Sequence, residues 1–344
     1  MAEGSSKLKE EDFVKPLFQN GKYQNPWKTW QRPSFGQMFK FLFFSQNEGS
    51  IPDQRELDRT LPVVKTDLSR FATSPVSGVR HMWIGHASSL VQFDGVTFLT
   101  DPIFSDRCSP TQWVGPKRYR PPPCTIDDLP HIDCVVISHN HFDHLDYGTV
   151  QGLVKRFGDR LRWYVPMGLK EWMLQSGCVN VVELSWWEED VLSPQSGVRF
   201  VCTPAQHWCK RGAFDDNKVL WCSWCVIGPT HRFYFAGDTG YCHVFKKIGE
   251  RYGPFTLATI PIGAYAPRWF LSYQHIDPKE AINIHTDIKS RKSIGVHWGT
   301  FPLGSKEFYL EPRQMIKDEL KVRGMDPLEF ITVQHGEIII TGET

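Results

Sequence analysis

The sequence CVVISHNHFDHLDYG, residues 134–148, joins a short apolar run to four potential metal ligands. The apolar run is typical of a strand that is buried on both faces. His139, His141, Asp143 and His144 follow it within six residues. Because alternate residues of an extended chain point the same way, His139 and His141 can share one metal ion. A turn after them would direct the other two ligands to a second metal ion.

The ligand types in this stretch narrow the choice of metal. Imidazole and carboxylate ligands without thiolate suit zinc, manganese or iron, and zinc is the commonest metal of hydrolytic sites. A histidine-rich surface turn is the alternative interpretation. The stretch directly follows a buried strand, where layered α/β folds usually place their active sites, and this favours the metal site.

Three further candidate ligands each come just after a short apolar run. His207 follows VRFVCTPAQ, Asp238 follows HRFYFAG, and His297 follows SIGV. A lone histidine in such a place is more often a structural residue than a ligand. Three such positions together with the four-residue cluster form a much more specific combination, so we expect all seven side chains to converge.

The chain divides into two regions of different composition. It has 344 residues, 41% of them hydrophobic, which is enough to bury a full core. Short strands alternate with helices over residues 76–344, which we predict to be one α/β catalytic domain. Residues 1–75 are predicted to form an arm, partly disordered, that docks on this domain. An apolar cluster in the arm is expected to pack on the core or, as the less favoured alternative, to insert at a membrane interface. The cluster consists of Met38, Phe39, Phe41, Leu42, Phe43 and Phe44.

Several elements of the domain carry local signals. The two-residue turn Asp94-Gly95 predicts a hairpin between two strands. Asp277, Pro278 and Glu280 form the N-cap, first position and capping box of a predicted helix. A further helix is predicted over 312–323, ending before Gly324. Three adjacent strands are predicted at residues 81–86, 90–95 and 96–102.

Charge and cysteine content exclude several classes of protein. The chain has 39 Lys and Arg against 38 Asp and Glu, so it lacks the positive field of nucleic-acid-binding proteins. Its start, MAEGSSKLKEEDF, has no basic region followed by an apolar stretch, so no secretory signal is predicted. Nine cysteines favour reduced thiols. No segment approaches the ~18 apolar residues of a membrane-spanning helix. We expect an intracellular protein that is soluble or peripheral on a membrane.

The pattern HxHxDH, followed by separate His, Asp and His at strand ends, resembles the metallo-β-lactamase superfamily. The resemblance implies an αββα sandwich, two packed β-sheets flanked by helices, with two Zn²⁺ ions at one edge. Asp101 and His86 are candidate partners that orient the ligating imidazoles, with an ordinary turn or core role as the alternative for each. The implied ligands are His139, His141 and His207 for a first zinc ion, Asp143, His144 and His297 for a second, and Asp238 as the bridge between them.

Within this superfamily the chain resembles the N-acyl-phosphatidylethanolamine-hydrolysing phospholipase D family from about residue 25 to residue 300. The resemblance implies release of N-acylethanolamine and phosphatidic acid from this membrane phospholipid. A metal-bridging hydroxide held by Asp238 would attack phosphorus, with no separate protein base. The stretches that carry the resemblance are NPWKTW, WIGHASSLVQ, TDPIFSDR, SHNHFDHLDY, TPAQHWCKR, FAGDTGYC, IGAYAPRWF, QHIDP and VHWGTF.

A charge count supports the same substrate class. Two divalent cations, two carboxylates, a bridging hydroxide and neutral histidines leave one net positive charge. Such a centre favours a monoanionic phosphodiester over a neutral ester or amide. The resemblance further implies a homodimer on the cytosolic face of internal membranes, Golgi and early endosome, which binds bile-salt-type amphiphiles near the site.

Other residues receive roles around the metals. His275 is expected to contact the substrate phosphate, with a hydrogen-bonded position before the helix as the alternative. Phe142 stands where vertebrate members of the family carry Tyr, and loss of the hydroxyl would weaken a polar contact to the substrate. Lys210 is placed near the amphiphile. A predicted helix is expected to touch the membrane, with core packing as the alternative, through Leu169, Trp172 and Met173.

Two other functions remain open from the sequence. One is a different hydrolase of the same fold, either a thioesterase or a nuclease, and the near-neutral charge counts against the nuclease. The other is a lipid-binding protein without turnover, which the seven complete ligand positions oppose.

Overall fold

The computed structural model describes residues 13–44 and 50–342 of the chain. The predictions for residues 1–12 and 45–49 therefore lie outside the described residues, as do those for the side chains of Leu42, Phe43 and Phe44. Within the described ranges, no helix is both long enough and apolar enough to cross a bilayer.

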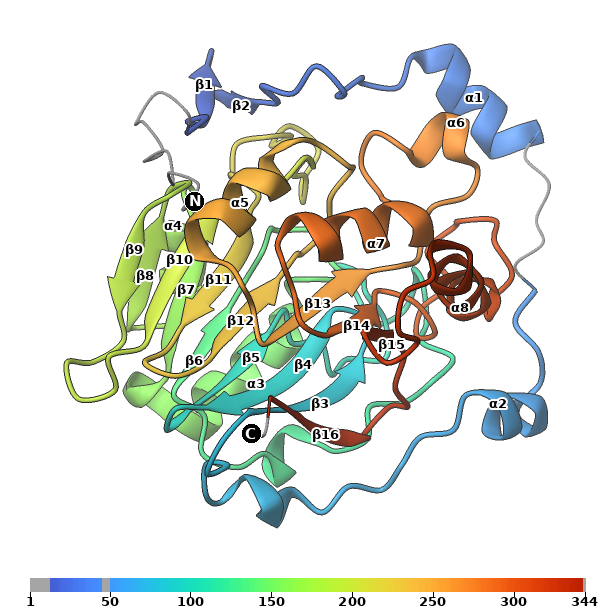
Figure 1. The fold of residues 1–344 in the computed structure, drawn as a ribbon. Helices are drawn as coiled ribbons and strands as arrows, with labels where there is room; N and C mark the ends of the chain where they lie inside the picture. The colour runs from blue at the N-terminus through green and yellow to red at the C-terminus, as the bar shows by residue number, and fades with distance from the viewer. Residues whose placement is uncertain (1–12, 45–49, 343–344) are drawn as a thin grey trace, which may run out of the picture.

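Two seven-stranded β-sheets pack against each other and enclose the core, as the resemblance implied (Figure 1). The first sheet has the strand order β16-β3-β4-β5-β6-β7-β8 and the second β15-β14-β13-β12-β11-β10-β9. The first sheet comprises β3 (Val79–Gly85), β4 (Ser88–Phe93), β5 (Val96–Thr100), β6 (Cys134–Val136), β7 (Arg162–Pro166), β8 (Val181–Leu184) and β16 (Ile338–Thr341). The second comprises β9 (Glu189–Val191), β10 (Arg199–Thr203), β11 (Ser223–Ile227), β12 (Arg232–Phe235), β13 (Leu257–Pro261), β14 (Ser293–Val296) and β15 (Phe330–Ile331).

Aromatic side chains join the inner faces of the two sheets. Phe98 of β5 meets Phe200 of β10 and Phe233 of β12 edge to face, each pair with ring centroids 5.6 Å apart. Tyr164 of β7 stacks on Phe200 at 4.4 Å. All four residues are buried, so the contact excludes water and fixes how one sheet lies on the other.

Helices cover the outer faces of the sandwich. The helix α3 (Tyr147–Phe157) joins the parallel strands β6 and β7 and buries Val150 and Leu153 against the first sheet. The helices α5 (Val244–Tyr252) and α7 (Pro278–Asp287) lie over the second sheet in Figure 1. The remaining helices are α1 (Phe35–Phe44), α2 (Gln54–Thr60), α4 (Lys170–Gln175), α6 (Arg268–Leu271) and α8 (Glu311–Arg323), with 3-10 turns at Leu68–Phe71, Ile126–Asp128 and Gly158–Arg160 and a small hairpin of β1 (Leu17–Gln19) and β2 (Lys22–Gln24).

The hairpin between β4 and β5 confirms the turn prediction. Asp94 and Gly95 have φ angles of 50° and 78°. Positive φ at both central residues is the geometry of the two-residue turn that matches the twist of paired strands, and Gly adopts it without strain.

The direction of the strands decides where the site forms. In the first sheet β5, β6, β7 and β8 run parallel, and in the second β12, β13, β14 and β15 do. The strand β10 is antiparallel to β11, which is antiparallel to β12, so β10 and β12 point the same way. The loops after β10, β12 and β14 therefore leave the second sheet at one edge.

Part of the predicted arm contacts that same edge. The Asn25 side-chain amide donates to the carbonyl of His207 at 2.7 Å, and the Trp27 indole donates to the carbonyl of Ala205 at 3.0 Å. Trp27 is buried. Phe41 of α1 stacks on Phe270 of α6 with ring centroids 4.3 Å apart. The segment from Asn25 to α1 thus lies along the loops that follow the strands.

The cap of α7 gives the first testable prediction. The Asp277 carboxylate accepts from the Glu280 backbone N–H at 2.9 Å, and Glu280 completes the predicted capping box. Replacing Asp277→Ala leaves that N–H without its partner and should lower the free energy of unfolding by about 1 kcal/mol in urea denaturation. Asp277→Asn keeps the acceptor and should stay near wild type. Equal losses in both variants would contradict the capping role.

Candidate metal centre

All seven predicted ligands lie together at the edge where the two sheets meet. The cluster from His139 to His144 follows β6 of the first sheet. His207 follows β10, Asp238 follows β12 and His297 follows β14, all in the second sheet. Ligands that are far apart in sequence become neighbours because their strands end at one edge.

A first group consists of three histidines. Nδ1 of His141 lies 2.9 Å from Nε2 of His139 and 3.3 Å from Nε2 of His207. Lone pairs of neutral imidazoles repel at such distances unless a proton or a cation lies between them. The other ring nitrogen of His141, Nε2, is buried and makes no hydrogen bond to any described residue. Nδ1 of His141 and the Nε2 atoms of His139 and His207 thus face a common point.

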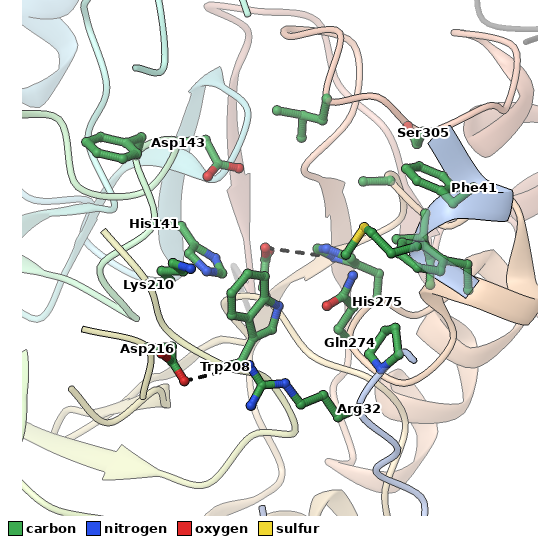
Figure 2. Close-up of a pocket in the computed structure, with 18 of the residues that line it drawn as sticks. Arg32, Phe41, His141, Asp143, Trp208, Lys210, Asp216, Gln274, His275 and Ser305 are labelled. Carbon is green, nitrogen blue, oxygen red and sulfur yellow. Dashed lines mark ion pairs between the residues drawn. The ribbon is translucent and has the colours of Figure 1, made fainter. Parts of the chain in front are cut away.

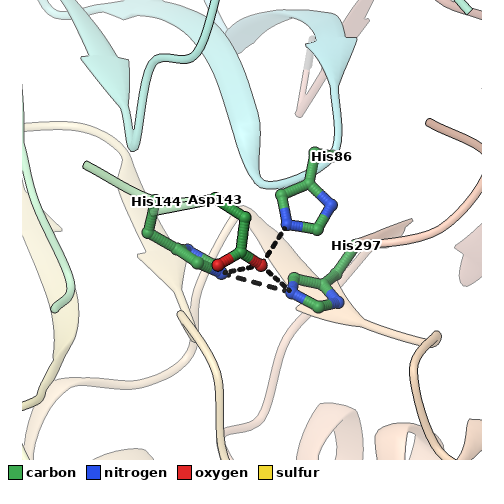
Figure 3. A group of neighbouring side chains, drawn as sticks. All are labelled: His86, Asp143, His144 and His297. Carbon is green, nitrogen blue, oxygen red and sulfur yellow. Dashed lines mark hydrogen bonds and ion pairs between the residues drawn. The ribbon is translucent and has the colours of Figure 1, made fainter. Parts of the chain in front are cut away.

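A second group contains His144, His297 and Asp143 (Figure 3). Nε2 of His144 lies 3.2 Å from Nε2 of His297. Oδ2 of Asp143 lies 3.5 Å from the first of these nitrogens and 3.6 Å from the second. His86 belongs to the same cluster, since its Nε2 lies 2.9 Å from Oδ2 of Asp143.

The carboxylate of Asp238 lies between the two groups. Its Oδ2 is 3.2 Å from Nε2 of His144 and 3.7 Å from Nε2 of His207. Its Oδ1 is 3.1 Å from Nε2 of His297. A single side chain therefore reaches ligands of both groups, which is the position that a bridging ligand occupies.

Except in His141, the second ring nitrogens of the candidate ligand histidines contact other groups. Nδ1 of His144 lies 2.6 Å from Oδ2 of Asp101, and Nδ1 of His207 lies 2.9 Å from the carbonyl of Gln274. Partners of this kind fix the ring orientation and the tautomer. Asp101 thus contacts an imidazole, whereas the hydrogen-bond partner of His86 is the carboxylate of Asp143 and not an imidazole.

Burial and charge act differently on the two groups. Burial lowers the pKa of His139 and His207 well below the usual range and lowers the pKa of His141 to about 4. These three rings are therefore neutral at pH 7, the form that binds metal. Burial also acts to lower the pKa of His144 and His297, but the carboxylates Asp238 and Asp143 outweigh it. They raise the pKa of His144 well above its usual range and that of His297 to about 9.

Backbone strain is concentrated at the same edge. His86, Asp101 and His297 have φ angles of 54°, 33° and 62°. Non-glycine residues rarely adopt such values, and the cost is accepted mainly where a side chain must be held in one place. All three side chains belong to the cluster described above.

The two groups open into a cavity of about 700 Å³ (Figure 2). In Figure 2, His141 and Lys210 lie on one side of it and His275 and Phe41 on the other. Substrate or amphiphile contacts were predicted for three residues that all line this cavity: His275, Phe142 and Lys210. Apolar side chains form much of its wall, including Trp30, Met38, Phe41, Phe270, Leu271 and Leu303.

The predicted membrane contacts of Leu169 and Met173 are wrong. These side chains are 1% and 0% exposed and belong to the core. The helix α4 is only six residues long and turns its apolar side toward the sandwich, so the helical spacing in the sequence marked a buried face. Trp172 is partly buried beneath Arg211, whose guanidinium lies 4.9 Å from its ring centroid.

Sequence reasoning missed Arg211. Its Nη1 donates to the carbonyls of Asn140 at 3.1 Å and Leu145 at 2.7 Å, the first between His139 and His141 and the second directly after His144. The guanidinium also lies 4.2 Å from the ring centroid of Phe142. Arg211 therefore contacts the candidate ligand loop at two points. Its position soon after His207 in the sequence was a signal, but nothing in the pattern showed where the side chain points.

This arrangement gives a prediction for the ligand loop. Arg211→Lys keeps the charge but shortens the side chain and loses the planar guanidinium that lies over Phe142 while its Nη1 donates to both carbonyls. Metal affinity, measured by competition with a chelator, should fall about 10- to 100-fold, as for other residues that support ligands. The control is Arg199→Lys, because Arg199 pairs with Glu189 on the surface. Unchanged affinity in Arg211→Lys would show that the loop holds its shape without this contact.

Comparisons with known proteins define the class. Residues 97–298 match the family described as a beta-lactamase superfamily domain. A solved metallo hydrolase, Igni18 from Ignicoccus hospitalis, has a similar fold, with a TM-score of 0.57 and 22% sequence identity over 77% of this chain and 99% of that chain. The fold and the domain match together place the chain among the hydrolases of the metallo-β-lactamase fold.

Two curated relatives narrow the class further. The chain is 44% identical over 342 residues to N-acyl-phosphatidylethanolamine-hydrolyzing phospholipase D 1 of Caenorhabditis elegans, covering 96% of this chain and 95% of the relative. It is 34% identical to the mitochondrial N-acyl-phosphatidylethanolamine-hydrolyzing phospholipase D of Saccharomyces cerevisiae, covering 88% of this chain and 72% of that protein. The chain belongs to the N-acyl-phosphatidylethanolamine-hydrolyzing phospholipase D family, as its motifs indicated.

Proposed function

We propose that this protein hydrolyses N-acyl-phosphatidylethanolamine at a membrane surface, releasing N-acylethanolamine and leaving phosphatidic acid. The convergence of five histidines and two aspartates at the base of a largely apolar cavity carries the proposal. The two relatives, both named for the hydrolysis of this phospholipid, supply the substrate. A cavity of this size accommodates a lipid headgroup with the first part of its chains.

The residues present fit two divalent cations. Nδ1 of His141 lies 2.9 Å from Nε2 of His139 and 3.3 Å from Nε2 of His207, and the donor set of imidazole and carboxylate without thiolate suits zinc. Zinc ions bound here would lower the pKa of a coordinated water and polarise the phosphate oxygens. The residues that would hold them are His139, His141 and His207 for one ion, Asp143, His144 and His297 for the other, and Asp238 for both.

Residues of the chain orient the substrate and the ligands. Nδ1 of His275 is buried, makes no hydrogen bond to the described residues and lies 3.8 Å from Oδ2 of Asp238. Because burial lowers the pKa of His275 to about 4, the ring is neutral at pH 7 and can donate to a phosphate oxygen without a competing salt bridge. Trp208 and Phe142 line the same cavity and keep bulk water from the phosphate.

The remaining features extend the proposal through the family resemblance. They are a catalytic domain at residues 76–344 with a docked arm, a homodimer on the cytosolic face of Golgi and endosomal membranes, and a bile-salt-type amphiphile beside Lys210. The contacts of Asn25 and Trp27 with the loop of His207 support the docked arm, and the place of Lys210 in the cavity lining supports the amphiphile.

The decisive assay compares substrates with and without chelator. The purified protein should release N-acylethanolamine from N-acyl-phosphatidylethanolamine, a chelator should abolish the release, and added zinc should restore it. Phosphatidylethanolamine and an acyl thioester should be much poorer substrates. Chelator-sensitive cleavage of the thioester alone would indicate a different hydrolase of this fold, and no turnover in any arm would indicate a lipid-binding protein.

Metal content tests the ligand assignment separately from activity. His141→Ala should lower the bound metal by at least one ion per chain, because it removes a donor of the first group. His131→Ala is the matched control, since His131 is largely exposed and pairs with Asp133 away from the seven candidate ligands. Full metal content in His141→Ala would show that the first group of histidines does not bind a metal ion through His141.

His275 can be separated from the ligands by the same measurement. If it binds substrate, His275→Ala should retain full metal content while kcat/KM falls about tenfold, the size expected for loss of one hydrogen bond to a charged group. His275 also lies near His207 and Asp238, so loss of metal in this variant would make it a ligand instead.

A further inference from the structure

Large apolar side chains are exposed around the mouth of the metal cavity. The loop 108–116 begins and ends in the cavity wall, since Cys108 and Pro116 both line it and the Cys108 N–H donates to the Pro116 carbonyl at 3.2 Å. Its tip carries Trp113 and Val114, which are 88% and 66% exposed. The tip therefore projects outward from the mouth.

A second loop repeats this arrangement. Lys210 and Asp216 line the cavity and bound the loop 210–216, whose tip carries Phe214 at 86% exposure. The Asp215 carboxylate accepts from the backbone N–H groups of Arg211 at 3.1 Å and Gly212 at 2.7 Å. These bonds close the loop tightly, so the exposed ring is held by an ordered turn.

The helices α1 and α6 add two more apolar side chains. Met38 and Phe41 of α1 and Phe270 of α6 line the cavity, and the stacking of Phe41 on Phe270 joins the helices. Their neighbours Phe39 and Trp269 are 48% and 37% exposed. We call the set Phe39, Trp113, Val114, Phe214 and Trp269 the mouth rim.

Basic residues accompany the mouth rim. Four exposed basic residues stand in the segments that carry or flank the rim, although the whole chain is nearly neutral: Arg32, Lys40, Lys117 and Lys210. Lys40 lies 4.9 Å from the ring centroid of Trp269, and Asp216 is neutralised by Lys22 at 2.9 Å. Aromatic side chains beside basic ones are the composition of surfaces that enter the interface of anionic bilayers.

We propose that the mouth rim inserts into an anionic phospholipid bilayer and places the cavity opening against the headgroups. This rests on the proposed function, because a lipid drawn from the bilayer would then reach the metal centre without crossing water. The rim comes from four separate segments that all contribute to the cavity wall, so its position follows the opening. Unlike the buried Leu169 and Met173, these side chains are accessible to lipid.

Vesicle sedimentation tests the proposal with the full chain. The double variant Trp113→Ser with Phe214→Ser should bind vesicles of phosphatidylcholine and phosphatidylserine about tenfold more weakly than wild type. Vesicle binding by the wild type and by the variant should weaken as the salt concentration rises. The matched control is Val322→Ser with Leu328→Ser, which removes two exposed apolar side chains outside the cavity-lining segments and should bind as wild type. Thermal melting confirms that each variant folds.

A second variant reports insertion directly. Val114→Cys labelled with an environment-sensitive fluorophore should shift to shorter wavelength on addition of these vesicles, while labelled Val322→Cys should not. Wild-type binding by the rim variant, or an unshifted label at residue 114, would overturn the proposal. Light scattering gives the molecular mass of the rim variant in solution. If that mass differs from wild type while vesicle binding is intact, the surface contacts a second copy of the chain and the proposal is overturned.

The substrate assay keeps this inference distinct from the proposed function. Vesicle binding is measured without turnover, so it can succeed even if no hydrolysis is found. If hydrolysis occurs, the rim variant should cleave a short-chain, monomeric N-acyl-phosphatidylethanolamine within about twofold of wild type, because the metal centre is untouched. Equal loss on monomeric and vesicle substrates would show that the rim residues act on the cavity and not on the membrane.

Discussion

The carboxylate of Asp238 lies almost fully buried among imidazoles from both sheets, and the rest of the site is arranged around it. A buried carboxylate is costly unless positive charge or hydrogen-bond donors surround it. Here the charge of His144, together with that of His297, outweighs the burial that would raise the pKa of Asp238, and holds that pKa well below its usual range. Bound cations would provide the same compensation. Together with the carboxylate of Asp143, that of Asp238 raises the pKa of His144 and His297 against the effect of burial.

The sandwich is what makes this contact possible. His144 follows β6 in the first sheet, while Asp238 follows β12 in the second, so neither sheet alone contains the site. The aromatic contacts of Phe98 and Tyr164 with Phe200 set the distance between the sheets. Loss of packing in the core would consequently displace the candidate metal ligands. The positive φ angles of His86, Asp101 and His297 indicate that the fold tolerates local strain to hold these side chains in place.

Local signals in the sequence predicted the parts of the structure that depend on neighbours in the chain. The turn at Asp94-Gly95 and the capping box at Asp277 follow from backbone chemistry within a few residues, and both were confirmed. Likewise, the spacing of the ligands and their positions after apolar runs predicted all seven candidate ligands. The contact of Arg211 with the ligand loop depends on tertiary folding, and no sequence pattern indicates it. The membrane contacts predicted for Leu169 and Met173 were wrong for a related reason. Helical spacing shows that an apolar face exists, but it does not show whether protein or lipid covers that face.

Anomalous scattering at the zinc absorption edge from crystals of the zinc-loaded protein tests the central claim most directly. The account predicts two peaks about 3.5–4 Å apart, the spacing usual for two-metal hydrolytic sites. One should lie among His139, His141 and His207, the other among Asp143, His144 and His297, with Asp238 in contact with both. A single peak, or two peaks away from Asp238, would contradict it.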